Sequence, residues 1–176
     1  EPSRPADGML FVLPAFGLNE EREERRRTLT ERCEFVAQTV QHTDQAVVWC
    51  HLNVEGDLLG KMIPDCRQVK GADTDEAKEE AYQDFKTGAV RVLVIKPKIG
   101  AYGLNWEHCN HVVTFASHSY EQFYQSVRRC WRFGQDHEVN AHIITAETEG
   151  AVVSNIKRKE REANETYDSM VAHMKD

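Results

Sequence analysis

The sequence has neither paired cysteines nor a long apolar run. Its five cysteines are an odd number and no two are spaced as Cys-x-x-Cys, so neither a disulfide framework nor a zinc ribbon is indicated. Such cysteines fit a reducing, intracellular setting, and we expect a cytoplasmic protein. No apolar run approaches the roughly 18 residues of a membrane-spanning helix, and no signal peptide is visible. The sequence therefore predicts no membrane partner.

An excess of basic residues is also missing. Lysine and arginine number 22 against 29 aspartates and glutamates, which gives a net charge of −7 over 176 residues. A free-standing nucleic-acid-binding protein is usually basic, so any nucleic-acid contact has to come from a local patch. The length suits one α/β domain with a buried core. Because the chain starts at Glu1 rather than Met, we expect it to be part of a longer polypeptide.

The phosphate-binding loop Gly-x-x-x-x-Gly-Lys-Ser/Thr is absent as well. Its nearest match, Gly60-Lys61, is followed by Met62, and Glu55 stands where the first glycine belongs. The segment DEAK at 75–78 resembles an acidic box, but no buried apolar strand precedes it to carry its carboxylates to Mg²⁺. It is typical of an acidic helix N-terminus instead. We expect no metal to be bound by this chain alone.

Apolar segments alternate with helical ones along the chain. A strand or packed segment is expected at 8–16, strands at 45–52, 67–71, 89–96, 111–117 and 139–145, and helices at 18–41, 54–63, 74–88, 119–134 and from 148 onward. This alternation predicts βαβ crossovers and a mainly parallel sheet with helices on both faces, an α/β fold. Ligands of such sheets bind at the carboxyl ends of the strands, which places the working loops at 52–56, 96–107 and 116–120.

The segment QSVRRCWRFGQ at 125–135 gathers three arginines within five positions of an acidic chain. On a helix of about 100° per residue, one arc holds Phe123, Tyr124, Val127, Cys130 and Trp131, and the opposite arc holds Gln125, Arg128, Arg129 and Arg132. We expect the aromatic arc to be buried and the guanidiniums to face outward. Neighbouring guanidiniums repel, so the cluster favours an anion such as phosphate, which suits the planar fork of arginine. A solvated basic face is the alternative.

This segment resembles motif VI of superfamily 2 helicases and translocases, closest to the Swi/Snf-like branch. The matching positions are Gln125, Arg129, Arg132, Gly134 and Gln135. The segment KPKIGAYGLNWEHCNHVV is similar to motif V through Gly100, Gly103, Leu104 and Asn105, with Ala101 in place of a second glycine. VVWCHLN is similar to motif IV, and the blocks keep the family's order across residues 45–146. The segments GLNWEHCNH and RRCWRFGQ resemble bacterial or phage members of the family more than eukaryotic remodellers.

The resemblance implies a RecA-like second lobe, three-layered and ending in a long helix. The whole of 1–176 would be this single domain, with 1–44 as an N-terminal extension and 148–176 as a C-terminal helix. In that family, ATP and Mg²⁺ lie between two lobes, and the first lobe, which supplies the phosphate loop, is missing from this chain. The second lobe supplies arginine fingers to the transferring phosphoryl group.

By position, the finger candidates are Arg129 and Arg132, and the other nucleotide-binding candidates are Gln125, Gly103 and Asn105. The nucleic-acid-binding candidates are His51, Asn53, Gly71, Lys96, Lys98 and Gly100. Arg128 has at most a supporting role. The resemblance implies two partners: a first RecA-like lobe of the same protein, and DNA. Double-stranded DNA is favoured because Swi/Snf-like members are generally translocases on double-stranded DNA and do not separate its strands. We expect the isolated chain to hydrolyse ATP negligibly.

The sequence also allows other interpretations of the chain's function and of single residues. A non-catalytic RecA-like module that binds nucleic acid or protein is the main alternative, and a Rossmann-type dinucleotide enzyme is disfavoured because GAYGLN lacks the Gly-x-Gly-x-x-Gly pattern. His108, Cys109 and His111 lack a fourth metal ligand, so we expect packing there. We expect Trp49 and Trp131 in the core, and Trp106 either packed under the motif V loop, which we favour, or stacked on a base. The run KRKERE at 157–162 is typical of a solvated helix face.

Overall fold

A computed structural model of the chain describes residues 18–100, 104–117, 119–146 and 150–173. The elements are α1 (Leu18–Arg27), α2 (Leu29–Thr39), β1 (Ala46–Trp49), α3 (Asn53–Met62), β2 (Cys66–Val69), α4 (Asp75–Thr87), β3 (Val92–Ile95), α5 (Pro97–Gly100), β4 (His111–Phe115), α6 (Tyr120–Val127), β5 (Asn140–Ile144) and α7 (Gly150–His173). Within these residues, no helix is both long and apolar enough to cross a bilayer. The segment expected at 8–16 lies outside them.

The strands form one parallel sheet, as the alternation of elements predicted. Its five described strands are ordered β2-β3-β1-β4-β5, and every neighbouring pair is parallel. In the central register, Val48 of β1 lies between Val94 of β3 and Val113 of β4. All residues of β1 and β3 are buried, which agrees with their continuous apolar sequences, since strands of a parallel sheet are covered on both faces.

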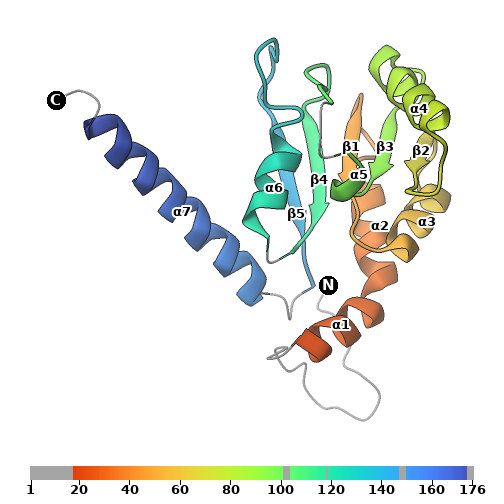
Figure 1. Cartoon of the computed structure of the whole chain (residues 1–176). Helices are drawn as coiled ribbons and strands as arrows, with labels where there is room; N and C mark the ends of the chain where they lie inside the picture. Colours follow the sequence, from red (N-terminus) through yellow and green to blue (C-terminus); the bar gives the residue numbers. More distant parts are fainter. Residues whose placement is uncertain (1–17, 101–103, 118, 147–149, 174–176) are drawn as a thin grey trace.

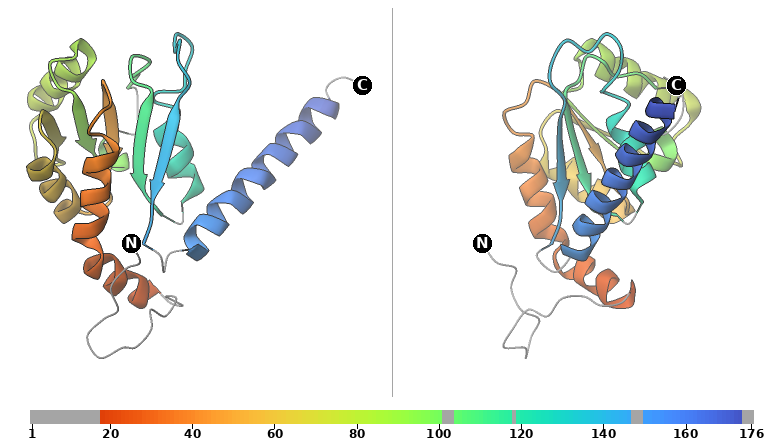
Figure 2. Two further views of the ribbon diagram at one scale, coloured as in Figure 1. Left: turned by 180° about the vertical axis from the view of Figure 1, so that it is seen from behind. Right: turned by 90° about the vertical axis from the view of Figure 1, so that its left-hand side faces the viewer.

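Helices cover both faces of the sheet, and each face has its own core (Figures 1 and 2). On one face, α2 and α3 bring Cys33, Val36 and Leu59 against the strands. On the other, α4 and the 104–110 loop bring Phe85 and Trp106. Each such side chain contributes roughly 1.5–3 kcal/mol when fully buried. The α/β three-layer fold is thereby confirmed. Helix α7 touches α6 near its start and then runs away from the sheet (Figure 1).

Helix α4 forms as its sequence predicts. The hydroxyl of Thr74 accepts a hydrogen bond from the backbone N–H of Ala77, so it caps the first turn. At the other end, Gly88 has φ +82°, the left-handed conformation in which only glycine is unstrained. Ala81 and Phe85 are the buried face between these caps. The helix has the expected bounds because cap, apolar spacing and terminal glycine all agree.

The helix expected at 119–134 ends earlier than predicted. Helix α6 stops at Val127, and the chain continues in turns such as Cys130 N to Val127 O at 3.0 Å and Arg132 N to Cys130 O at 3.1 Å. The helical wheel for 123–132 is right for Cys130, which is buried, and for Arg132, which is exposed, but it is wrong for Tyr124, which is 41% exposed rather than buried. The side chain of Arg129, expected outside, is 6% exposed, and that of Trp131, expected in the core, is 55% exposed. The burial of Arg129 has its physical reason in tertiary hydrogen bonds, described below.

Two smaller differences separate expectation and structure. The helix expected at 18–41 is divided into α1 and α2 at Thr28, whose hydroxyl donates to the carbonyl of Glu24 at 2.8 Å. A short helix, α5, follows β3 where no helix was predicted. It starts at Pro97, a residue that suits the first position of a helix because its missing N–H would have no partner there.

Candidate functional site

The predicted nucleic-acid residues gather at one edge of the sheet. Because all strands are parallel, their carboxyl ends meet at the same edge (Figure 1). His51 and Asn53 follow β1, Gly71 follows β2, and Lys96 follows β3. Asn53 and Gly71 are exposed, whereas His51 and Lys96 are half-buried. The edge is thus accessible at several points that are far apart in sequence.

The turn between β1 and α3 is held by a side chain that the sequence motifs did not single out. Oε2 of Glu55 accepts hydrogen bonds from the backbone N–H groups of His51 and Leu52, both at 2.9 Å. The carboxylate caps the N-terminus of α3, where negative charge is favourable. A Ser or Thr at the cap position would have signalled this arrangement, but that position is Leu52.

His51 points back toward the sheet. Its Nε2–H donates to the carbonyl of Phe115 at 3.1 Å, because a carbonyl can only accept. Burial lowers the pKa of His51, although the carbonyl of Phe115 and the charge of Glu55 act in the opposite direction. The imidazole is therefore neutral at pH 7. Since its one N–H is used on Phe115, the neutral ring keeps only Nδ1 as an acceptor and offers a phosphate neither a donor nor a charge.

A cavity of about 430 Å³ opens between α5 and α6. Its lining is mostly polar and comprises Trp49, Pro97, Lys98, Ser119, Glu121, Gln122, Gln125, Ser126 and Arg129. The cavity unites three predicted site residues, Lys98, Gln125 and Arg129. Two of these were assigned to the nucleotide and one to nucleic acid.

Arg129 is fixed to the loop that carries motif V. Its backbone carbonyl accepts a hydrogen bond from Trp106 N at 2.8 Å, and its Nη1 donates to the carbonyl of Leu104 at 3.5 Å. Trp106 itself is buried and makes tilted or edge-to-face ring contacts with Trp49, Tyr82 and Phe85 at centroid distances of 5.7, 6.2 and 5.7 Å. The backbone and the side chain of Arg129 are thus both bonded to the 104–106 loop, which accounts for the burial of this arginine.

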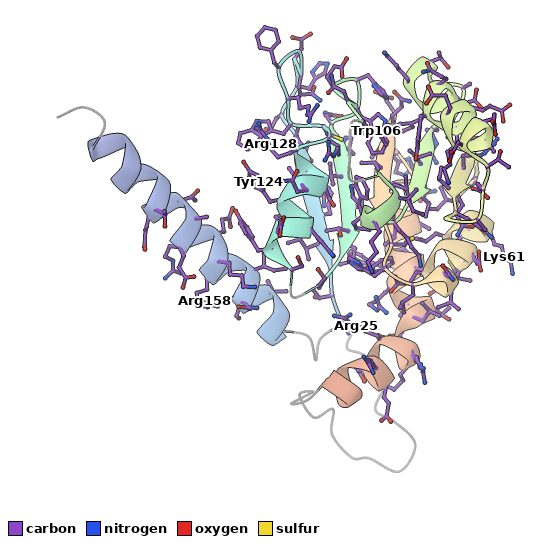
Figure 3. All side chains as sticks on the ribbon, viewed as in Figure 1. Arg25, Lys61, Trp106, Tyr124, Arg128 and Arg158 are labelled. Atoms are coloured by element: carbon purple, nitrogen blue, oxygen red, sulfur yellow. The ribbon has the colours of Figure 1, made fainter. Side chains whose placement is uncertain are left out.

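Arg132 and Arg128 have a different environment from Arg129. Arg132 is exposed, and its Nε donates to the carbonyl of Arg128 at 3.0 Å. The guanidinium of Arg128 lies over the ring of Trp131, 5.2 Å from its centroid. Figure 3 shows Arg128 at the outer side of the molecule and Trp106 inside it. The two finger candidates therefore differ in burial, since Arg129 is buried and Arg132 is exposed.

The end of motif VI closes back on motif V. Gly134 has φ +97°, a left-handed conformation that favours glycine. Nε2 of Gln135 then donates to the carbonyl of Cys109 at 3.0 Å. Asn105 is exposed on the motif V loop, while Gly103 lies outside the described residues. Gly100 is buried, and a Cβ there would lie 2.9 Å from Cζ3 of Trp49, so this glycine permits close packing.

The remaining sequence assignments concern the tryptophans, Cys109 and helix α7. Trp49 and Trp106 are core residues as predicted, whereas Trp131 is not. Cys109 packs in the core between β1, β4 and the motif VI segment. Among the described residues, no group of three or more His, Cys, Asp and Glu side chains could hold a metal ion. Lys157 and Arg158 are exposed on α7, as expected for a solvated face.

Solved structures with a similar fold include part of an ATPase domain and a DEAD-box protein. The C-terminal part of the Fun30 ATPase domain superposes with a TM-score of 0.60 at 17% identity, covering 72% of this chain and 44% of that one. The Escherichia coli DEAD-box protein SrmB, solved with the regulator RraA, gives a TM-score of 0.63 at 16% identity, covering 74% and 79%. At these identities the likeness shows the fold.

Curated relatives agree with the fold match. Bifunctional helicase and thymine dioxygenase JBP2 of Leishmania tarentolae is 35% identical over 110 residues, 58% of this chain and 10% of that protein. The Leishmania major protein of the same name is 34% identical over 103 residues, 55% of this chain and 9% of that protein. The chain thus spans about a tenth of the length of these relatives. The expected bacterial or phage origin gains no support from them and stays a prediction.

One family description covers most of the sheet, motif V and the arginines of motif VI. Residues 26–134, from the end of α1 through motif VI, match the helicase conserved C-terminal domain. The matched region includes four of the five described strands, the α5–α6 cavity and the segment that contains Arg129 and Arg132. The chain therefore belongs to the helicase conserved C-terminal domain family.

Proposed function

We propose that this chain is the second motor lobe of a DNA-dependent ATPase of the Swi/Snf-like kind, which translocates on double-stranded DNA. In this proposal, ATP and Mg²⁺ are held mainly by a first RecA-like lobe of the same protein. The second lobe contributes Arg129 and Arg132 to the nucleotide and a row of loop residues to the DNA backbone. Helicase C-terminal lobes in general belong to ATP-dependent enzymes. The arginine fingers and the double-stranded DNA track are parts of this proposal.

The observation that carries the proposal is the anchoring of Arg129 beside the α5–α6 cavity. Its carbonyl and its guanidinium both bond the loop of Leu104 and Trp106. A guanidinium held by packing loses little entropy when it meets an anion, and preorganised cations stabilise developing charge most effectively where water is excluded. Lys98 lies on the same cavity and adds a second cation, while Gln125 adds an amide.

Arg132 would complete the site only when a first lobe faces it. On its own it is solvated, and a charge in water contributes little to an ion pair because the dielectric is high. Closure of a second lobe over Arg132 would remove that water and strengthen its attraction to the γ-phosphoryl group. This reasoning supports the expectation that the isolated chain turns over ATP negligibly.

The DNA side of the proposal rests on the carboxyl edge of the sheet. Asn53 and Gly71 are exposed there and can offer an amide and a backbone N–H to phosphates. Lys96 follows β3 on the same edge and brings positive charge. The Leishmania relatives combine a helicase with a thymine dioxygenase, and thymine is a base of DNA, which favours DNA over RNA as the track.

The test uses the full-length polypeptide that carries this lobe. Its ATPase rate is measured alone, with double-stranded DNA, with single-stranded DNA and with RNA. We expect the largest stimulation with double-stranded DNA. Equal rates in all four conditions would overturn the proposal of a DNA-coupled motor, and no turnover in any condition would overturn it in favour of a non-catalytic binding module. Robust turnover by the isolated 176 residues, abolished by Arg132→Ala, would contradict the requirement for a first lobe.

A further inference from the structure

A buried ion pair joins the N-terminal helices to the carboxyl edge of the sheet. Nη1 of Arg32, on α2, lies 3.2 Å from Oε1 of Glu55, on α3, and the two side chains are 4% and 2% exposed. Removing two charges from water costs several kcal/mol per ion, and apolar residues of similar volume are often as stable. Stability alone therefore does not account for a pair at this position.

Arg32 also forms hydrogen bonds with residues other than Glu55. Its Nε donates to Oγ1 of Thr28 at 3.2 Å, and its Nη2 donates to the carbonyl of Arg25 at 2.7 Å. The face of the guanidinium lies 4.9 Å from the ring centroid of Phe115, at the end of β4. A planar fork can satisfy partners in three directions at once, which an ammonium cannot. One side chain thus bridges α1, α2, α3 and β4.

Glu55 bonds the turn that carries predicted DNA contacts. Its other oxygen, Oε2, accepts the backbone N–H groups of His51 and Leu52. His51 in turn donates to the carbonyl of Phe115 at 3.1 Å, and Nη2 of Arg25 donates to the carbonyl of Ala116 at 3.2 Å. The β1–α3 turn and the end of β4 are therefore connected through one polar network.

The end of β4 leads into the helix that lines the cavity. After Ala116, the chain reaches Ser119, whose hydroxyl accepts the N–H of Gln122 and caps α6. Helix α6 then presents Gln125 and precedes Arg129 at the cavity. A displacement of the β1–α3 turn that is transmitted to Phe115 and Ala116 would therefore change the start of α6.

We propose that Arg32 and Glu55 form a positioning pair that couples DNA bound at the β1–α3 turn to the placement of Arg129 beside the nucleotide. The inference rests on the proposed function. Neither residue touches DNA or nucleotide in this proposal, because both are buried beneath the turn. Their role is to hold the His51 turn and the Phe115–Ala116 segment in one fixed relation, a contiguous polar connection through which two sites can influence each other.

The test compares two double variants of the full-length protein. Arg32→Met with Glu55→Gln removes the ion pair, and glutamine keeps an oxygen that can accept from His51 and Leu52. Replacing both partners avoids the uncompensated buried charge that a single replacement leaves. The matched control is Arg158→Met with Glu162→Gln, which removes an exposed ion pair on α7 whose side chains are both 56% exposed.

We expect the pair variant to keep its DNA-free ATPase rate and its KM for ATP. Its stimulation by double-stranded DNA at saturating DNA should fall about tenfold, within the range that network residues change coupling. The control variant should be stimulated like the wild type. If the pair variant fails to fold, Arg32→Lys, which keeps the charge but not the fork, is expected to lower the stimulation in the same direction.

The outcomes separate this inference from the function on which it rests. A stimulated wild type with an equally stimulated pair variant overturns the coupling role and leaves the proposed function standing. A pair variant that loses DNA-free and DNA-stimulated rates in equal proportion also overturns it, because the pair would then serve the fold alone. A wild type that DNA does not stimulate overturns the proposed function, and the coupling role with it.

Discussion

The backbone N–H of Trp106 donates a 2.8 Å hydrogen bond to the carbonyl of Arg129. This bond makes the loop of motif V and the segment of motif VI one unit. Trp106 is 2% exposed and packs on Trp49 and Phe85, so the position of Arg129 is set by the aromatic core rather than by a helix. An arginine placed this way is preorganised before any ligand arrives.

Arg132 offers the cleanest test of the finger assignment. It is exposed and its one described side-chain bond goes to a backbone carbonyl, so Arg132→Ala should leave the fold intact. In the full-length protein we expect kcat for ATP hydrolysis to fall about a thousandfold, the lower end of the effect of arginine fingers. The KM for ATP should change less, because the interaction is strongest in the transition state.

Arg128→Ala is the matched control for that measurement. Arg128 is four residues away and loses its stacking on Trp131 when truncated, but it is not a family position. We expect its kcat to remain close to that of the wild type. If Arg128→Ala and Arg132→Ala reduce kcat equally, the segment acts through general positive charge and the finger assignment is wrong.

The sequence predicted the sheet better than the site. Strands β1 and β3 are apolar, β-branched and short, and α4 has a Thr cap and a terminal glycine; each signal is local, so the elements appear where expected. The burial of Arg129 depends on its bond with Trp106, which joins residues distant in sequence. A helical wheel contains no information about such a bond, and it therefore placed Arg129 outside.

Gly100 should be intolerant of any side chain. A Cβ there would lie 2.9 Å from Cζ3 of Trp49 and 3.0 Å from Cδ1 of Ile95, both buried and closely packed. We expect Gly100→Ala to lower the free energy of unfolding by about 1–3 kcal/mol, the usual effect of overpacking. Urea denaturation of this chain measures the change through the midpoint.

Gly60→Ala is the control, since it makes the same substitution in open space. Gly60 is exposed inside α3, and the nearest atom to its added Cβ is Oε1 of Gln68 at 3.8 Å. The substitution should stabilise the chain by about 0.5–1 kcal/mol, because alanine favours a helix interior over glycine. Equal effects of the two substitutions on the free energy of unfolding would show that the close approach of Gly100 to Trp49 does not make Gly100→Ala destabilising.

Acid should destabilise the chain through its half-buried histidines. Burial is the largest cause that lowers the pKa of His51, His108 and His111 below the usual value of 6.5. In the unfolded chain these rings take up protons near pH 6.5, whereas the folded chain resists protonation to lower pH. Stability is therefore fully present above pH 6.5 and is lost as pH falls through the lowered values.

His51 allows that prediction to be assigned to one residue. It is faced by Glu55 from α3, Arg25 from α1 and Arg32 from α2. His51→Gln keeps a donor for the carbonyl of Phe115 and removes the titration, so the loss of stability between pH 7.5 and pH 5.5 should be smaller in the variant. Urea midpoints at the two pH values measure it, and an unchanged loss would assign the effect to the other histidines.

The pair of Arg32 and Glu55 was not predictable from the sequence. Arg32 sits in a charged helical segment, and buried arginines are rare enough that exposure is the default expectation. Glu55 attracted notice because it breaks a phosphate-loop pattern, which says nothing of burial. The pair forms because α2 and α3 lie side by side on one face of the sheet, an arrangement that follows from the packing and not from local spacing.

Three of the five cysteines should react slowly with alkylating agents, and Cys66 should react before the other two. Burial raises the pKa of Cys33 and of Cys66 to about 11 and that of Cys50 to about 12. Only the thiolate is a nucleophile, so a pKa near 11 instead of 9 lowers the reactive fraction at pH 8 about a hundredfold. Cys66 is half-buried while Cys33 and Cys50 are fully buried. Alkylation of the native chain at pH 8, followed by mass spectrometry, should therefore modify Cys66 before Cys33 and Cys50, whereas the urea-unfolded chain should react at all five cysteines at similar rates. If Cys50 reacted before Cys66, the β1–α3 turn would have to open often despite its hydrogen bonds to Glu55.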